Sequence, residues 1–328
     1  MLLWLLTFIL GVPPSPEPSP QRLADKAFGK PAEIEVRDLP PEVAREAIRR
    51  AFTAIAETER LTDAARPDGG LTALNAAAGK GPQKSDPRLL AMLGRAADFC
   101  FWSEGAHGPL GRDLYALWGL RSAVTDPPSP EQVEKAAGLT TCTRLTVDLE
   151  KGTAELAAGS GLDLWGFAEG LAVDRAAEVL RQSGAANGFV RIGAVQRGFG
   201  AGPRGKGWPV ELPRLPGLEE AAGHLFLRDH ALAFASPSDH PLAPLAGAAP
   251  YLNQRTGRPA EGVLATVAVT EQAADAQGLA TALFILGPRE GQVRLGSLRP
   301  RPSVLWFLGS GSGAPLQVDY RWSEVSRR

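Results

Sequence analysis

The fold is decided by the stretch Asp163-Leu-Trp-Gly-Phe-Ala-Glu-Gly-Leu-Ala-Val-Asp-Arg-Ala176, in which a strand-like lead-in, two glycines and an amphipathic helix follow one another without a gap. Gly166 and Gly170 carry no Cβ atom, so other groups can approach the backbone closely at both positions. The apolar stripe that follows predicts a helix, whose first amides have no partner within the helix. Such a helix start can hold an anion, and we interpret the segment as a seat for a pyrophosphate.

Composition limits the class of protein. The chain has 328 residues and 44% hydrophobic content, enough for the core of one extended domain or two smaller ones. Its net charge of -1 comes without long runs of one sign, so we expect no nucleic acid and no anionic membrane surface as partner. The two cysteines, Cys100 and Cys142, fit neither a disulfide framework nor a cysteine metal site, and a single bridge between them stays open.

The N-terminus predicts export. Residues 2–12 are nearly all apolar, and a proline-rich spacer follows at 13–20. The run is shorter than the roughly 20 residues that a membrane-spanning helix needs, and it suits the apolar core of an export signal. We therefore expect residues 1–27 to be an export signal or short anchor with a spacer. The protein would then lie in the periplasm or cell envelope, free or held to a membrane by this segment; a disordered apolar terminus is the alternative.

Helical and strand patterns alternate along the rest of the chain. Apolar residues at helical spacing predict helices at 41–59, 87–102, 130–137 and 275–286, besides the one that follows Phe167. Strands are predicted at 33–36, 144–147, 153–156, 188–192, 208–212, 225–227, 231–235, 264–269 and 304–308. Helices dominate the first half and strands the second. This order favours an α+β (α/β) fold and argues against a doubly wound nucleotide-binding fold.

Two short motifs invite other readings. The segment Gly200-Ala-Gly-Pro-Arg-Gly-Lys-Gly207 nearly spells a phosphate loop, but a glycine replaces the hydroxyl residue and a strand pattern follows where a helix is needed. We interpret it as a hairpin loop. Ser236, Asp239 and His240 stand in one proline-bracketed loop, whereas the members of a catalytic triad usually come from distant parts of a chain. The four histidines lack zinc-ligand spacing.

Several segments together resemble the ApbE-type FAD:protein FMN transferases, whose signature usually reads D-x-G-G-x-A-K-G-x-x-x-D. The signature corresponds to Asp163–Asp174, and the further matches are Pro67-Asp-Gly-Gly-Leu-Thr-Ala-Leu-Asn75, Leu117-Trp-Gly119, Tyr251-Leu-Asn-Gln-Arg-Thr-Gly257 and Gly278-Leu-Ala-Thr-Ala-Leu-Phe284. The resemblance runs in order from about residue 28 to 308. It implies ApbE-like mixed sheets with packed helices over a domain at 28–328.

The resemblance also implies ligands and site residues. It implies FAD as the cofactor, Mg²⁺ as the metal, and an acceptor protein that carries a threonine as the partner. The positions that match flavin-binding positions of the family are Asn75, Asp163, Gly166, Gly170, Asp174, Arg255, Thr256 and Gly257. Metal ligands would come from the Ala168 carbonyl, the Thr281 hydroxyl and, as a substitute carboxylate, Asp275. No catalytic residue can be assigned.

The chain departs from the family pattern where charge matters most. Glu169 stands at the signature lysine, Gln277 at the metal-binding aspartate, and Tyr251 at the histidine. A carboxylate ~4 Å from a phosphate would repel it by about 4 kcal/mol at an effective dielectric constant of roughly 20. The chain is therefore either a magnesium-dependent flavin transferase or a catalytically impaired ApbE-like module that binds flavin, another nucleotide or a protein. An FAD hydrolase is a third alternative.

Overall fold

One antiparallel sheet organises the fold. The computed structural model describes residues 19–121, 124–215, 221–237, 250–310 and 313–326. Eight strands pair in the order β1-β2-β6-β7-β10-β13-β14-β15, and every neighbouring pair is antiparallel. These strands are β1 (Gln21–Ala27), β2 (Lys30–Val36), β6 (Gly188–Ile192), β7 (Val195–Phe199), β10 (His230–Ala235), β13 (Val263–Thr270), β14 (Ser303–Leu308) and β15 (Leu316–Tyr320).

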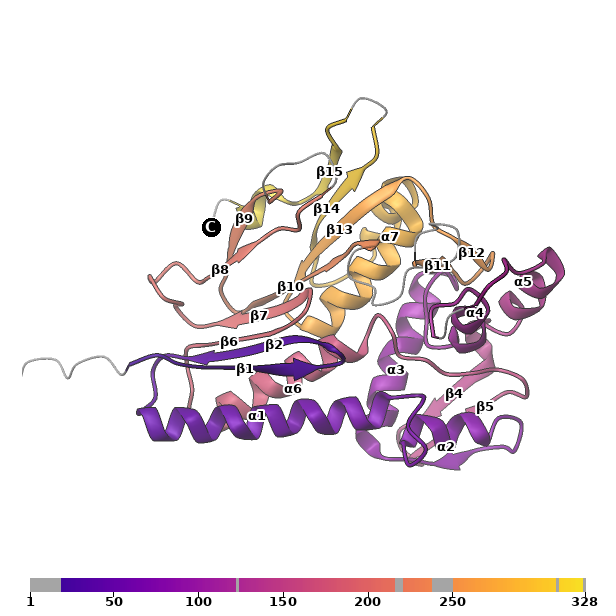
Figure 1. Ribbon diagram of the computed structural model, residues 1–328, viewed down its shortest axis with the longest axis horizontal. Coiled ribbons are helices and arrows are strands. Elements are labelled where there is room, and N and C mark those ends of the chain that lie inside the picture. Colours follow the sequence, from indigo (N-terminus) through magenta and orange to yellow (C-terminus); the bar gives the residue numbers. More distant parts are fainter. Residues whose placement is uncertain (1–18, 122–123, 216–220, 238–249, 311–312, 327–328) are drawn as a thin grey trace, which may run out of the picture.

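Helices cover one face of this sheet. The helix α7 (Ala273–Leu295) packs on β10 and β13, α6 (Ala168–Gln182) packs beside α7, and α1 (Pro41–Thr62) lies along α6 (Figure 1). Val173, Ala176 and Ala177 of α6 are fully buried between these elements. Gly287, with a φ of 66°, interrupts α7 ahead of Pro288, so the second half of the helix takes a new direction.

The opposite face of the sheet has its own core. Strands β8 (Trp208–Glu211) and β9 (His224–Leu227) form a separate pair over this face, with the short α8 (Ser323–Ser326) beside β9. The buried side chains of β13 alternate between the two cores: Val267 and Val269 pack with Trp208 and Leu227, whereas Ala268 faces the helices. Alternation with a period of two residues is the expected behaviour of a strand buried on both faces.

A smaller lobe joins the helical side. It holds α2 (Gly70–Ala76), α3 (Pro87–Trp102), α4 (Arg112–Leu117), α5 (Pro130–Ala137), the turn η1 (Cys142–Arg144) and the sheet β3-β5-β4, made of β3 (Gln83–Lys84), β5 (Thr153–Leu156) and β4 (Leu145–Asp148). A short pair, β11 (Leu252–Asn253) and β12 (Arg258–Pro259), lies beside it (Figure 1). A disulfide between Cys100 and Cys142 ties the end of α3 to η1. The bridge that the sequence left open is therefore formed.

The predicted α+β class is confirmed, with two differences in detail. Gln21–Ala27, which the sequence placed in the spacer, forms β1 and pairs with β2 along its whole length. Gly200–Gly207 does not close a hairpin but connects β7 to β8, which belongs to another sheet, and no helix follows it. The apolar run at 2–12 lies outside the described residues, as do Asp239 and His240. No helix in the described part of the chain is long and apolar enough to cross a membrane.

Candidate functional site

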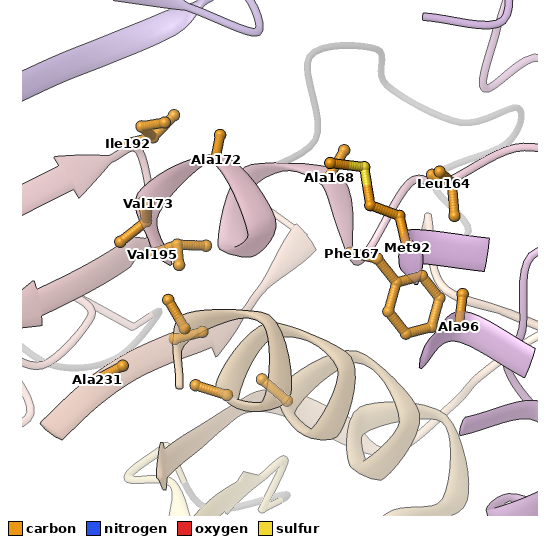
Figure 2. Packing of buried hydrophobic residues seen from close by; sticks show 14 of the residues in the cluster. Met92, Ala96, Leu164, Phe167, Ala168, Ala172, Val173, Ile192, Val195 and Ala231 are labelled. Atoms are coloured by element: carbon orange, nitrogen blue, oxygen red, sulfur yellow. The ribbon is translucent and has the colours of Figure 1, made fainter. Parts of the chain in front are cut away.

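The start of α6 is built from two glycines that serve different purposes. Gly166 has a φ of 88°, and a Cβ atom there would lie 2.8 Å from the Nε2 atom of His107. At Gly170 a Cβ atom would lie 2.5 Å from the carbonyl oxygen of Ala273, so glycine lets α6 touch the first turn of α7. Between them, Phe167 turns toward Ala96 of α3 (Figure 2). The signature segment therefore packs α6 against both α7 and α3.

A cavity of about 330 Å³ opens at this point. Its wall contains Asp163, Gly166, Ala168 and Glu169 from the signature and Gln277 from α7. The other charged residues of its wall are Lys30, Glu59, Asp63 and Arg121. The start of α6 and one side chain of α7 therefore meet at one cavity.

Glu169 is not an isolated negative charge in this cavity. Its Oε1 atom lies 2.6 Å from the Nζ atom of Lys30, on β2, and its Oε2 atom accepts a hydrogen bond of 3.3 Å from the side-chain amide of Gln277. The Gln277 Oε1 atom accepts a hydrogen bond of 2.8 Å from the Gly170 backbone amide. Burial raises the pKa of the Glu169 carboxyl, and Lys30 opposes that shift. The repulsion expected from the sequence is therefore offset by a lysine that the sequence analysis had not connected to it.

Asp163 is also paired. Its Oδ2 atom lies 2.5 Å from the Nε atom of Arg121, and its Oδ1 atom accepts a hydrogen bond of 2.8 Å from the Trp165 backbone amide. The guanidinium of Arg121 lies over the Tyr115 ring, with its central carbon 5.3 Å from the ring centroid. Burial is the largest effect on Tyr115 and raises the pKa of its hydroxyl. These contacts fix the lead-in to the signature.

His107 lies behind the cavity, against Gly166. It is fully buried, its ring stacks on Phe167 with centroids 4.6 Å apart, and neither ring nitrogen has a hydrogen-bond partner in the described structure. Burial lowers the pKa of His107 from 6.5 to about 3, so the ring is neutral at physiological pH. It supports Gly166 and Phe167 from behind the cavity.

The structure does not bring the three expected metal ligands together. Asp275 turns away to Arg95, whose Nη2 atom is 2.5 Å from its carboxylate, and it lines a different cavity from Ala168. Thr281 is buried on α7, with its methyl group 3.3 Å from where a Gly166 Cβ atom would lie. Among the described residues, no cluster of three or more His, Cys, Asp or Glu side chains could hold a metal. Because Mg²⁺ prefers carboxylate and water oxygens, the donors at this site do not fit it.

Two of the predicted flavin-binding residues support the backbone instead. The Asn75 side-chain amide donates a hydrogen bond of 3.0 Å to the Leu162 carbonyl and accepts one of 2.6 Å from the Leu162 amide. It thereby ties α2 to the segment before the signature. Asp174 accepts hydrogen bonds from the Ala273 and Ala274 amides, at 2.8 and 2.9 Å, and pairs with Arg197. Asp174 of α6 therefore satisfies the first two amides of α7 and joins the two helices.

Two of the remaining three predicted residues line another cavity. Arg255 and Thr256 lie in the wall of a cavity of about 820 Å³, together with Cys142 of the disulfide. The guanidinium of Arg255 binds both carboxylate oxygens of Glu290, each at 3.0 Å. Gly257 has a φ of 68° and closes the turn between β11 and β12. The sequence grouped these residues with the signature, and the structure separates them from it.

Sequence reasoning missed Lys30 and Arg121. Both are single cations far from the signature along the chain, with no motif around them. The useful signal was Glu169 itself, because a buried carboxylate needs a partner.

The fold and the site define an α+β protein with a charged cavity at a glycine-rich helix start. The chain belongs to the ApbE family, whose characteristic sequence matches residues 28–305. Proteins called FAD:protein FMN transferase are similar to it: one from Treponema pallidum is 33% identical over 155 residues, and one from Vibrio cholerae is 25% identical over 235 residues. These matches cover 45% and 69% of this chain, and 42% and 69% of the two relatives.

Solved structures share the fold. The flavin transferase ApbE from V. cholerae superposes with a TM-score of 0.83 at 20% identity, and the ApbE protein from Thermotoga maritima with a TM-score of 0.84 at 21% identity. Each match covers 94% of this chain and 100% of the other. The predicted ApbE-like fold is confirmed.

Proposed function

We propose that this protein is a flavin transferase that takes FAD as its substrate and attaches FMN to a threonine hydroxyl of an acceptor protein. Family membership and the names of its relatives support the proposal. The observation that carries it is the cavity in which the start of α6, Gln277 of α7 and Lys30 of β2 meet. The Ala168 and Gly170 amides at the start of α6 are bound to Leu164 and Gln277, contrary to the expectation of free amides, so the lysine is the group of this cavity that suits a pyrophosphate.

The reaction exchanges one phosphorus–oxygen bond for another. The threonine oxygen bonds to the phosphorus of the FMN half, the bond between the two phosphates breaks, and AMP leaves with the electron pair while the hydroxyl proton is released to solvent. Positioning and stabilisation of phosphate charge supply most of the acceleration in such transfers. Magnesium is the metal that the family resemblance implies. Because the described donors do not fit it, we assign no step to a metal.

The test is transfer to a threonine peptide. Purified protein is incubated with FAD and the peptide, with and without magnesium chloride, and mass spectrometry is used to find a peptide heavier by FMN less one water and an equal amount of AMP. A peptide with valine in place of threonine is the matched control, because it has the same shape without the hydroxyl. Neither product appearing, while the V. cholerae relative yields both, would contradict the proposal.

A second candidate is a flavin-binding module without transferase activity. The observation that favours it is the placement of Asp275, which binds Arg95 and leaves Gln277 as the side chain of α7 at the cavity. FAD that binds without AMP release would support this candidate. Free FMN without any acceptor would instead indicate FAD hydrolysis.

Export is a further part of the proposal. The disulfide between Cys100 and Cys142 supports it, because structural disulfides persist mainly in oxidising compartments such as the periplasm. We propose that the segment before β1 directs the chain to the cell envelope, with or without membrane attachment. Fractionation of cells that produce the full chain, followed by N-terminal sequencing, tests both points, and protein found only in the cytosol would contradict them.

A further inference from the structure

We infer that Lys30 is the cation that holds the pyrophosphate of the dinucleotide, in place of the lysine of the family signature and of a divalent metal. This inference rests on the proposed function, since it names the residue that recognises the phosphates of FAD. Glu169 is then a positioning residue, which acts through Lys30 and does not touch the substrate.

The fold aims Lys30 at the cavity. Lys30 begins β2, directly after the β1–β2 turn in which Phe28 and Gly29 have φ values of 52° and 71°. The Phe28 amide donates a hydrogen bond of 2.9 Å to Glu59 of α1, which fixes the turn against the helix. Gly193 makes room for the side chain, because a Cβ atom there would lie 2.7 Å from the Cδ atom of Lys30. A side chain held in this way, against Gly193 and by Glu169, loses little entropy when it binds a ligand.

The contacts of Lys30 leave it able to bind a phosphate. Its ammonium has three N–H groups, and within the described structure its ion-pair partner is Glu169. The Lys30 side chain is 19% exposed, whereas that of Glu169 is 9% exposed. Glu169 is further held by Gln277, and its side chain is the more deeply buried of the two. A phosphate that enters can therefore share the lysine without displacing the pair.

The other carboxylates of the cavity are already bound. Asp163 pairs with Arg121, Glu59 accepts the Phe28 amide, and Asp63 accepts the Ala65 amide at 2.9 Å. The signature of the family carries its positive charge on α6; here α6 carries the negative charge and β2 the positive one. Glu169 compensates the charge of Lys30, so the lysine recognises a phosphate through its remaining N–H groups, by charge-assisted hydrogen bonds.

The experiment measures binding of three ligands to Lys30→Met. Binding of FAD, ADP and riboflavin is followed by fluorescence or calorimetry, in EDTA and in magnesium chloride. We expect FAD and ADP to bind roughly tenfold more weakly to the variant, since a charge-assisted hydrogen bond is lost. Riboflavin, which has no phosphate, should bind as it does to the wild type. Lys26→Met, an exposed lysine of β1 in the same hairpin, is the matched control and should change nothing.

Two double variants guard against loss of folding. Lys30→Met with Glu169→Gln removes both charges, so no buried carboxylate is left alone, and it should show the same weak binding of FAD and ADP. Lys30→Glu with Glu169→Lys returns the positive charge to α6 and should recover most of the affinity. Thermal unfolding of each variant checks that the fold is kept.

Clear outcomes would overturn the inference. Equal loss of FAD and riboflavin binding, unchanged FAD binding in both variants that lack Lys30, or ADP binding that needs magnesium would each contradict it. Binding that follows the expected pattern without transfer to a threonine would contradict the proposed transferase activity and leave the role of Lys30 supported. Failure of the wild type to bind either FAD or ADP would contradict both.

Discussion

At the scale of single residues, His107 gives the sharpest prediction. Its pKa in the folded protein is about 3, below the ordinary value of 6.5, so the unfolded chain takes up the proton first. The contribution of His107 to the free energy of unfolding is therefore fully present above pH 6.5. It falls by about 1.4 kcal/mol per pH unit as the pH drops toward 3. We expect His107→Phe to lack this contribution.

Denaturant unfolding at a series of pH values checks this prediction. The difference in free energy between the variant and the wild type should be constant above pH 6.5 and should shift steadily in favour of the variant below it. Two parallel curves between pH 4 and 7 would show that the histidine titrates equally in both states.

Gly170 gives a second residue-scale prediction. In Gly170→Ala the new methyl group would lie 2.5 Å from the Ala273 carbonyl oxygen, so α6 must move away from α7. Overpacking of this kind typically costs about 1–3 kcal/mol. Gly94→Ala in α3 is the matched control: no atom lies within 4 Å of its Cβ position, and it should stabilise the helix by about 0.5–1 kcal/mol. Equal effects of the two changes on unfolding by denaturant would contradict the close approach of the helices.

At the scale of elements, the second half of α7 is joined to the turn between β11 and β12 by Glu290. Hydrogen bonds from Arg255, and then from Arg294, hold the pKa of Glu290 below its ordinary value of 4.5. A lowered acid pKa means that the pair stabilises the fold above pH 4.5 and that this contribution is lost as the pH falls through the folded-state pKa. Glu290→Gln should thus be less stable than the wild type at pH 7 and equally stable at the acidic end. Melting temperatures measured across that range check it, and a difference that persists at the lowest pH would argue against the ion pair as its source.

Most elements could be predicted from the sequence because their patterns are local. The helices α3 and α5 each begin with a proline and end where the apolar spacing ends. The first and last residues of both helices were therefore predicted correctly. Strand β1 was missed because five of its seven residues are exposed and its sequence shows no apolar alternation; only pairing with β2 makes it a strand. The kink at Gly287 likewise depends on the tertiary structure around α7.

The site could be predicted only in part, for the same reason. Glycines at 166 and 170 predict that other groups approach the backbone closely there, and the structure confirms this, with His107 at Gly166 and Ala273 at Gly170. Whether Asp275 or Gln277 faces the cavity depends on the rotation of α7, which Asp174 sets by capping its first turn. The role of Lys30 could not be predicted, because its ion pair with Glu169 joins β2 to α6, which are far apart in the sequence, and no local pattern indicates such a contact.

At the scale of the whole molecule, the disulfide joins the two parts of the smaller lobe. Cys100 and Cys142 are separated by 42 residues, and a bridge over such a loop typically contributes about 2–4 kcal/mol. Reduction with dithiothreitol should therefore lower the melting temperature of the wild type. The variant in which both cysteines are alanine should melt lower from the start and should not respond to the reductant. A wild-type melting temperature that is insensitive to reduction would mean that the lobe holds together without the bridge.

The position of β1 has a practical consequence for anyone who shortens the chain. Family similarity begins at residue 28, and a truncation there would look natural. It would strip β1 from the sheet and uncover the backbone amides and carbonyls of β2 along seven residues. A bare strand edge of that length invites self-association into oligomers or aggregates. It would also remove the β1–β2 hairpin that positions Lys30, so the shortened protein should be both less soluble and weaker in ligand binding.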